Sequence, residues 1–294
     1  MWFTARLALA CIFLGALAVV AARPQLQVGR SADILFVVDV SRSMHARFSC
    51  SEPTFLARAK DVIRETVDGI PESRFGIVAF DRFAFPVSQL TTDRGYIEQV
   101  IDNGLHVGLM LEATQTGIAN ALAVVAAKKA RLPDLYGNVT HVLVLSDGHV
   151  QGDFRRRLQA PLTELRDRGI RVSTVGIGNP VATPIVATRN AECSGEHIEI
   201  DGGTVLVPLR ADVLKYVATE SGGNYYTESQ TGELVAMLRS ELGGEHIAGE
   251  RSDGLRRDVS VVFLTIATVA LALYLYLPVR MSRRPRTPYR AATE

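Results

Sequence analysis

The sequence predicts an α/β fold: a doubly wound, mostly parallel β-sheet with one antiparallel edge strand, followed by a C-terminal transmembrane helix. Short runs rich in β-branched residues alternate with helical patterns through most of the chain. That alternation is typical of a parallel sheet covered by helices on both faces. Apolar runs stand at both ends of the 294-residue chain. Between them lie roughly 220 residues, enough for one well-packed domain.

The first expected strand is residues 32–40, a continuous apolar and β-branched run. It is too short for a helix and is typical of a strand buried on both faces. A helix is expected from Thr54 to about Val67. The next two strands, 74–80 and 84–90, are expected to form a hairpin, because a short turn separates them.

The rest of the central region continues the alternation of strands and helices. Further helices are expected at 93–101, 116–131, 155–168, 211–220 and 232–242. Further strands are expected at 138–145, 170–177 and 224–227, with a small hairpin at 197–208 around Asp201. In such sheets, ligands bind at the carboxyl ends of the strands.

Charge and cysteine content exclude some classes of protein. The 32 Lys and Arg residues nearly balance the 31 Asp and Glu residues, for a net charge of +1. We therefore expect no nucleic-acid partner. Of the three cysteines, Cys11 lies in the N-terminal apolar run, and Cys50 and Cys193 do not form a zinc motif. Cys50 and Cys193 either pair in an oxidising compartment or remain two separate thiols.

The N-terminal apolar run resembles a secretion signal. Arg6 precedes residues 7–22, which are almost wholly apolar and end in small side chains. The run is short for a membrane-spanning helix, which needs about 20 residues. A cleaved signal and a retained anchor within residues 1–22 both fit, and both send the following chain across the membrane.

The C-terminal run, residues 259–279, is expected to cross the membrane. It has no charged residue, and Tyr274 and Tyr276 lie near one end, where an aromatic belt is usual. The arginine-rich tail, 280–294, indicates a cytoplasmic C-terminus. We therefore expect a folded domain at 32–242 and a linker at 243–257. Both would lie outside the cytoplasm of a bacterial cell, on the periplasmic side of the inner membrane.

Oxygen-bearing side chains follow two of the expected strands. Asp39, Ser41 and Ser43 form an Asp-x-Ser-x-Ser pattern at the end of the first strand, and Asp147 follows the strand at 138–145. Thr116 begins a helix. Carboxylates and hydroxyls at one sheet edge suit a hard divalent cation, Mg²⁺ first and Ca²⁺ or Mn²⁺ as alternatives.

These motifs, in this order, resemble the von Willebrand factor A (VWA) family, whose fold is Rossmann-like. The resemblance implies a metal-ion-dependent adhesion site with Asp39, Ser41, Ser43, Thr116 and Asp147 as its ligands. It implies direct contacts from both serines, and direct or water-mediated contacts from the other three. Thr114 is the alternative to Thr116, and either threonine also suits a helix N-cap.

The same resemblance predicts a binding module. One coordination position stays open, and in this family an acidic residue of a partner protein fills it. We expect no enzyme: HExxH, Gly-x-Ser-x-Gly and Walker A motifs are missing, and no aspartate stands two residues after Asp39. A metal-dependent hydrolase is the less favoured alternative. Arg42, His45 and His149 are expected at the rim of the site.

Much of the central region, roughly residues 32–242, together with the C-terminal anchor resembles a membrane-bound bacterial branch of the family, the Bat-type aerotolerance proteins encoded with MoxR-type AAA+ ATPases. The resemblance rests on Val175-Gly176-Ile177-Gly178 and on the run from Ala211 to Tyr226. It implies other VWA proteins and an AAA+ ATPase system as partners. The alternative is a factor for methanol dehydrogenase maturation that delivers metal. Residues 180–196 depart from the branch, and a bridge from Cys193 to Cys50 would hold the rim of the metal site.

Overall fold

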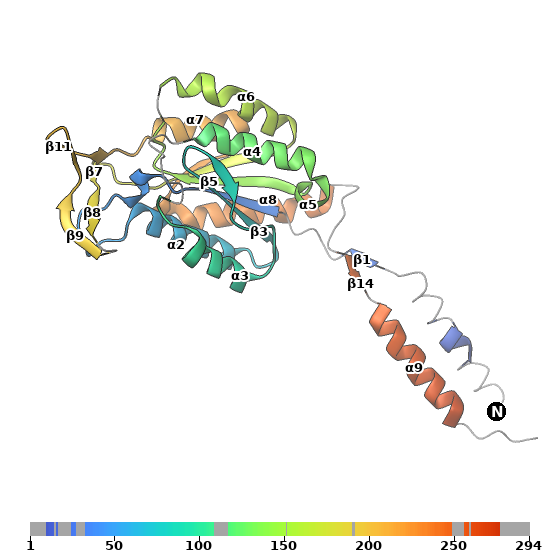
Figure 1. The fold of residues 1–294 in the computed structure, drawn as a ribbon. Helices are drawn as coiled ribbons and strands as arrows, with labels where there is room; N and C mark the ends of the chain where they lie inside the picture. The colour runs from blue at the N-terminus through green and yellow to red at the C-terminus, as the bar shows by residue number, and fades with distance from the viewer. Residues whose placement is uncertain are drawn as a thin grey trace, which may run out of the picture. The chain divides into compact units, whose positions relative to one another are not determined.

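The computed structural model describes residues 10–14, 16, 25–27, 33–108, 117–150, 152–189, 192–248, 256–258 and 260–276. It divides into two compact units. Ser31–Ser252 forms one unit, and Met1–Arg30 with Asp253–Glu294 forms the other. Figure 1 labels the elements of both units, which are described separately below.

The larger unit is built on a six-stranded sheet with the order β13-β6-β5-β2-β3-β4. Its strands are β2 (Asp33–Asp39), β3 (Arg74–Phe80), β4 (Ala84–Pro86), β5 (Val139–Ser146), β6 (Arg171–Gly176) and β13 (Tyr225–Thr227). All neighbours pair in parallel except β3 and β4, which are antiparallel. The predicted mostly parallel sheet with one antiparallel edge strand is confirmed.

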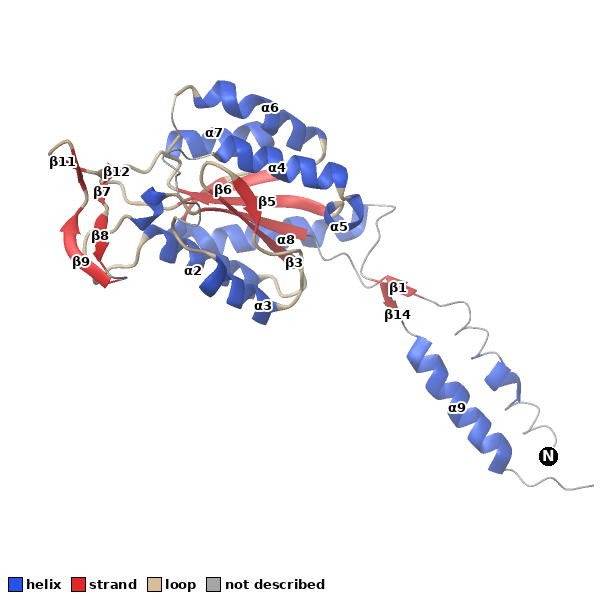
Figure 2. Ribbon diagram, viewed as in Figure 1, coloured by secondary structure: helices blue, strands red, loops and turns tan. Residues whose placement is uncertain are grey.

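Helices cover both faces of this sheet (Figure 2). One face packs against α2 (Phe55–Gly69), α3 (Arg94–Gln99) and α8 (Thr231–Ala248). The other packs against α4 (Ile118–Arg131), α5 (Pro133–Tyr136), α6 (Phe154–Asp167) and α7 (Ala211–Ser221). Along β2, Ile34 and Phe36 point into the first core, and Leu35 and Val37 into the second. This two-residue period is the reason the strand is apolar throughout.

Two elements, β4 and α8, differ most in length from the sequence prediction. The strand expected at 84–90 stops at Pro86, because the hydroxyl of Ser88 accepts from the Ile77 N–H at 2.9 Å. The N–H groups of Val87 and Ser88 both donate to the Ile77 carbonyl, so the regular ladder ends there. At the other end of the unit, α8 continues to Ala248, into the segment expected to be a linker.

A small antiparallel flap, residues 183–189 and 192–207, lies beyond the carboxyl edge of the main sheet (Figure 1). Its strands are β7 (Thr183–Pro184), β8 (Val186–Arg189), β9 (Glu192–His197), β10 (Glu199–Ile200), β11 (Gly203–Thr204) and β12 (Leu206–Val207). The predicted hairpin around Asp201 is present as β10 and β11. The pairing of β8 with β9 was not predicted.

The smaller unit contains the chain's two ends. In it, β1 (Gln25–Gln27) pairs antiparallel with β14 (Arg256–Asp258), and α9 spans Ser260–Tyr276. Residues 10–14 are helical. Within the part of the chain that the structure describes, no helix is both long enough and apolar enough to span a bilayer. Most of the predicted signal segment and the whole tail at 280–294 lie outside the described residues.

Candidate metal centre

Two buried aspartates meet at the carboxyl edge of the sheet. Asp39 is the last residue of β2, and Asp147 directly follows β5. These strands are parallel neighbours, with Val38 opposite Leu145. Parallel strands end at one edge, so the chain direction brings the two carboxylates together. Both side chains are fully buried.

The loop after β2 carries the two predicted serine ligands. The Ser41 N–H donates to Asp39 Oδ1 at 2.9 Å, which folds the loop back toward the strand end. A short 3₁₀ turn, η1 (Arg42–His45), follows, and its Met44 is buried in the core. The hydroxyl oxygens of Ser41 and Ser43 lie 3.0 Å apart. Asp39, Ser41 and Ser43 therefore present a carboxylate and a hydroxyl pair in one place.

The backbone around Asp147 holds its carboxylate in place. Asp147 Oδ1 accepts from the His149 N–H at 2.9 Å, and the Asp147 carbonyl accepts from the Arg210 N–H at 2.7 Å. Gly148 has a φ of 76°, and a Cβ there would lie 2.5 Å from the Arg210 carbonyl oxygen. Only glycine fits that close approach. Asp147 Oδ2 is buried and has no hydrogen-bond partner among the described residues.

Ser146 is a site residue that the sequence analysis missed. Its hydroxyl donates to Asp39 Oδ2 at 2.6 Å and accepts from the Gly148 N–H at 2.9 Å. It is fully buried and joins the two aspartate-bearing loops. The available signal was a hydroxyl at the end of an apolar strand, directly before an aspartate.

Burial makes the two carboxylates costly to ionise in the absence of a cation. It raises the pKa of Asp39 to about 7, and the neighbouring charge of Asp147 adds to that rise. Burial also raises the pKa of Asp147, against the effect of hydrogen bonds from Ser43 and His149. No arginine or lysine among the described residues forms an ion pair with either carboxylate. A divalent cation at the unpartnered Asp147 Oδ2 would offset this cost, so these residues fit a metal ion.

The described residues contain no cluster of three or more His, Cys, Asp or Glu side chains suited to a metal. The predicted ligand set therefore depends on its hydroxyl groups as well as on its two carboxylates. Hard oxygen donors of both kinds are what Mg²⁺ prefers. Of the histidines expected at the rim, His149 lies in the loop after β5 and His45 is the last residue of η1; both are half-buried.

Thr116 and Thr114 lie outside the described residues, so their side chains are not placed. The next residue, Gly117, is placed. Its N–H donates to the carbonyl of Asp81, which directly follows β3. β3 is the parallel neighbour of β2 and ends beside Asp39. The start of α4 therefore lies at the same edge of the sheet as the two aspartates.

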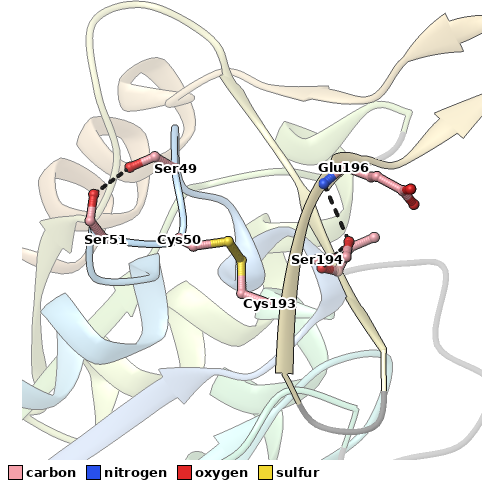
Figure 3. Close-up of a disulfide and its surroundings, with 7 residues drawn as sticks. Ser49, Cys50, Ser51, Cys193, Ser194 and Glu196 are labelled. Carbon is pink, nitrogen blue, oxygen red and sulfur yellow. Dashed lines mark hydrogen bonds between the residues drawn. A yellow bond between two sulfur atoms is a disulfide. The ribbon is translucent and has the colours of Figure 1, made fainter.

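A disulfide ties the flap to the loop that follows η1. Cys50 and Cys193 are bonded, with their Cα atoms 5.7 Å apart (Figure 3). The pairing is reinforced by a β-bridge between Ala46 and Ile185, and the Arg47 N–H donates to the Pro184 carbonyl at 3.0 Å. Of the two alternatives that the sequence left open, the structure has the bridge.

Comparison with known proteins identifies the family. The family model for the von Willebrand factor type A domain matches residues 33–196. That range includes Asp39, Ser41, Ser43 and Asp147. The chain belongs to the VWA family. The family match agrees with the resemblance drawn from the Asp-x-Ser-x-Ser loop and the later aspartate.

Two mycobacterial proteins are similar to most of the chain. The chain is 27% identical over 267 residues to a UPF0353 protein of Mycobacterium bovis, covering 86% of this chain and 70% of that protein. It is 28% identical over 261 residues to a UPF0353 protein of Mycolicibacterium vanbaalenii, covering 84% and 71%. The VWA domain thus lies within a longer stretch of sequence similarity.

Two solved structures share the fold. An aerotolerance-related membrane protein of Bacteroides fragilis aligns with a TM-score of 0.61 at 21% identity, over 73% of this chain and 100% of that one. The BatB protein of Bacteroides thetaiotaomicron aligns with a TM-score of 0.61 at 20% identity, over the same shares. At this identity the likeness concerns the fold. The methanol-dehydrogenase alternative stays a prediction.

Proposed function

We propose that this protein is a VWA module that binds a partner protein through a divalent metal ion. Asp39, Ser41, Ser43, Thr116 and Asp147 would hold the ion. The observation that carries the proposal is the pair of fully buried carboxylates at one sheet edge. Asp147 Oδ2 has no partner among the described residues. Buried charge without compensation is costly, so a site of this kind suits a cation.

The chemistry of the donors favours Mg²⁺, with Ca²⁺ and Mn²⁺ as competitors. Two carboxylates balance the charge of a divalent ion, and hydroxyl groups add neutral oxygen donors. Five protein donors leave one position of an octahedral shell for an outside ligand. A carboxylate from a partner protein is the natural occupant, since it is a hard anionic oxygen. No catalytic step is proposed, because no nucleophile or general base accompanies the ligands in a known catalytic motif.

Membrane anchoring is part of the proposal. Residues 259–279 are free of charge, and the tail at 280–294 is rich in arginine. Insertion of the first segment with the second on the cytoplasmic side would place the VWA domain outside the cytoplasm. The Cys50–Cys193 disulfide suits an oxidising compartment of that kind. Fusion of alkaline phosphatase after residue 252 and after residue 290 tests it: activity only at the first position supports this topology.

The metal site is tested by calorimetric titration of the full chain with Mg²⁺. We expect binding to be lost in Asp39→Asn and in Asp147→Asn, because each change removes a charge that balances the ion. Asp134→Asn is the matched control, since Asp134 is exposed on α5 at the opposite edge of the sheet. Partner capture from the native membrane is then compared with and without EDTA. Unchanged Mg²⁺ binding in both site variants would overturn the proposal.

A further inference from the structure

The tip of the flap is acidic and apolar. β10 and β11 are joined by Asp201 and Gly202, whose φ angles of 54° and 77° are those of a tight hairpin turn. Glu199 and Asp201 are exposed, and neither has an ion-pair partner among the described residues. Ile200, between them, is 64% exposed. The turn therefore holds two free carboxylates on either side of an uncovered apolar side chain.

The rim of the metal site has the complementary chemistry. Arg42 stands between the two serine ligands, and Arg82 lies in the turn between β3 and β4. Both are exposed, and neither has a carboxylate partner in the part of the chain that the structure describes. The Arg82 guanidinium lies 5.5 Å from the ring centroid of Phe83, which is 54% exposed. The rim thus combines free arginines with an uncovered aromatic ring.

The β3–β4 turn is fixed to the scaffold rather than loose. The Phe83 N–H donates to Asp81 Oδ1 at 3.1 Å, and the Asp81 N–H donates to the Phe83 carbonyl at 3.0 Å. The Arg82 carbonyl accepts from Asn120 Nδ2 on α4 at 2.9 Å. A surface held in this way needs little ordering on binding, which favours association.

We infer that the flap tip of one copy of this chain docks on the metal-site rim of a second copy. One tip carboxylate, from Asp201 or Glu199, would occupy the open position of the metal, and the other would pair with Arg82. Ile200 would pack against Phe83. The inference rests on the proposed function, because it names the partner that supplies the metal-binding carboxylate. Charge complementarity between the tip and the rim is the argument for a second copy.

The position of the flap allows the exchange to be reciprocal. Its base is fixed to the loop after η1 by the disulfide and the Ala46–Ile185 bridge. Figure 1 shows the β11 end as an outermost part of the carboxyl edge, the edge that also carries the metal site. Two copies facing each other can therefore each insert a tip, as a two-fold axis requires. Because only the hairpin tip would make each contact, we expect association weaker than that of a standard interface of about 800 Å² per partner, and dependent on the metal.

The test is sedimentation velocity of the full chain, purified in detergent micelles, with Mg²⁺ or with EDTA. We expect a dimer with Mg²⁺ and a monomer with EDTA. The tip variant Glu199→Gln/Asp201→Asn keeps the turn, because asparagine tolerates a positive φ. The rim variant is Arg82→Gln. Each variant alone should raise the dimer dissociation constant at least tenfold.

An equal mixture of the two variants sharpens the test. The tip variant keeps an intact rim and the rim variant keeps an intact tip, so mixing restores one of the two contacts. Dimer formation in the mixture, above that of either variant alone, supports the inference. Glu220→Gln and Arg131→Gln are matched controls, because both residues are exposed on helix ends away from the site.

Two outcomes would overturn the inference while leaving the proposed function intact. One is a chain that binds Mg²⁺ by calorimetry but remains monomeric at about 100 µM, well above micromolar affinity. The other is a dimer that persists in EDTA and in the tip variant, which would indicate association through another surface. Loss of Mg²⁺ binding in the unaltered chain would instead contradict the proposed function itself.

Discussion

The strand β2 begins and ends with a fully buried aspartate, and the two carboxylates have different surroundings. Asp33, at the start, forms a double hydrogen-bonded ion pair with Arg74, whose Nε lies 2.7 Å from Asp33 Oδ1. Asp39, at the end, has hydroxyl and backbone donors but no cation from the described residues. The chain supplies a cation at one end of the strand and leaves the other end without one. We interpret the first as a structural pair and the second as a site for an external ion.

The largest effect is expected from Arg74→Met, which leaves Asp33 buried without its cation. Breaking a buried ion pair by removing one partner costs about 3 kcal/mol, and Arg74 is only 25% exposed. Urea unfolding of the full chain at pH 7 measures the loss. We expect no change in Mg²⁺ affinity, because the Asp33–Arg74 pair lies at the opposite end of β2 from Asp39.

The matched control is Arg94→Met. Arg94 pairs with Asp68 at 3.5 Å, with the two side chains 42% and 77% exposed. An exposed pair of this kind contributes at most about 0.5 kcal/mol. A result in which Arg74→Met lowers the free energy of unfolding no more than Arg94→Met does would show that Asp33 does not need Arg74. It would also contradict the proposed difference between the two ends of β2.

The next effect in size is expected from Asp39→Asn, and its sign is opposite. In metal-free protein at pH 8 the Asp39 carboxylate is mostly ionised, although burial, together with the neighbouring charge of Asp147, raises its pKa to about 7. Removing that charge should stabilise the metal-free fold by about 2 kcal/mol. Thermal unfolding in EDTA is the measurement, with Asp33→Asn as the counterpart that should destabilise. A loss of stability in Asp39→Asn would show that Asp39 is as structural as Asp33.

A smaller effect is expected from Ser146→Ala. The Ser146 hydroxyl orients Asp39 and accepts from the Gly148 N–H. Removing a group that orients a metal ligand weakens metal binding by about tenfold or more. Ser173→Ala is the control, because the Ser173 hydroxyl, in the middle of β6, accepts from the Asn224 N–H and not from a residue of the candidate site. Equal Mg²⁺ affinity in Ser146→Ala and the unaltered chain would remove Ser146 from the site.

The fold was predictable because its elements follow local rules. The apolar run at 32–40 predicted the doubly buried strand β2, and the helix expected from Thr54 is α2, for which Thr54 is the N-cap. The positions of Asp39 and Asp147 followed in turn, since parallel strands share a carboxyl edge. Sequence therefore located the two carboxylates of the candidate site before any side-chain geometry was known.

What the sequence did not predict depends on contacts between distant residues. The end of β4 is set by the Ser88 hydroxyl on Ile77, and α8 passes through Gly243 and Gly244 despite their low helix propensity. The pairing of β8 with β9 accompanies the Cys50–Cys193 bridge, which spans 143 residues. Ser146 stands directly before Asp147 at the end of an apolar strand, but its hydrogen bond to Asp39, 107 residues away in the sequence, cannot be inferred from that segment.

The smallest effect expected is a pH dependence of metal binding. It distinguishes Asp39 from Asp33, at the other end of β2, without any mutation. The pKa of Asp39 is raised from 3.8 to about 7 in the metal-free fold. The stability that comes from its protonated form is therefore present near pH 4 and is lost as the pH rises through about 7.

A metal ion needs the ionised carboxylate of Asp39, so Mg²⁺ must displace the proton below pH 7. We expect Mg²⁺ affinity to be about eightfold weaker at pH 6 than at pH 7.5, and Mg²⁺ to raise Tm more at pH 8 than at pH 5.5. Calorimetric titrations across this range measure the first, and an affinity independent of pH would mean that Asp39 is already ionised without the metal.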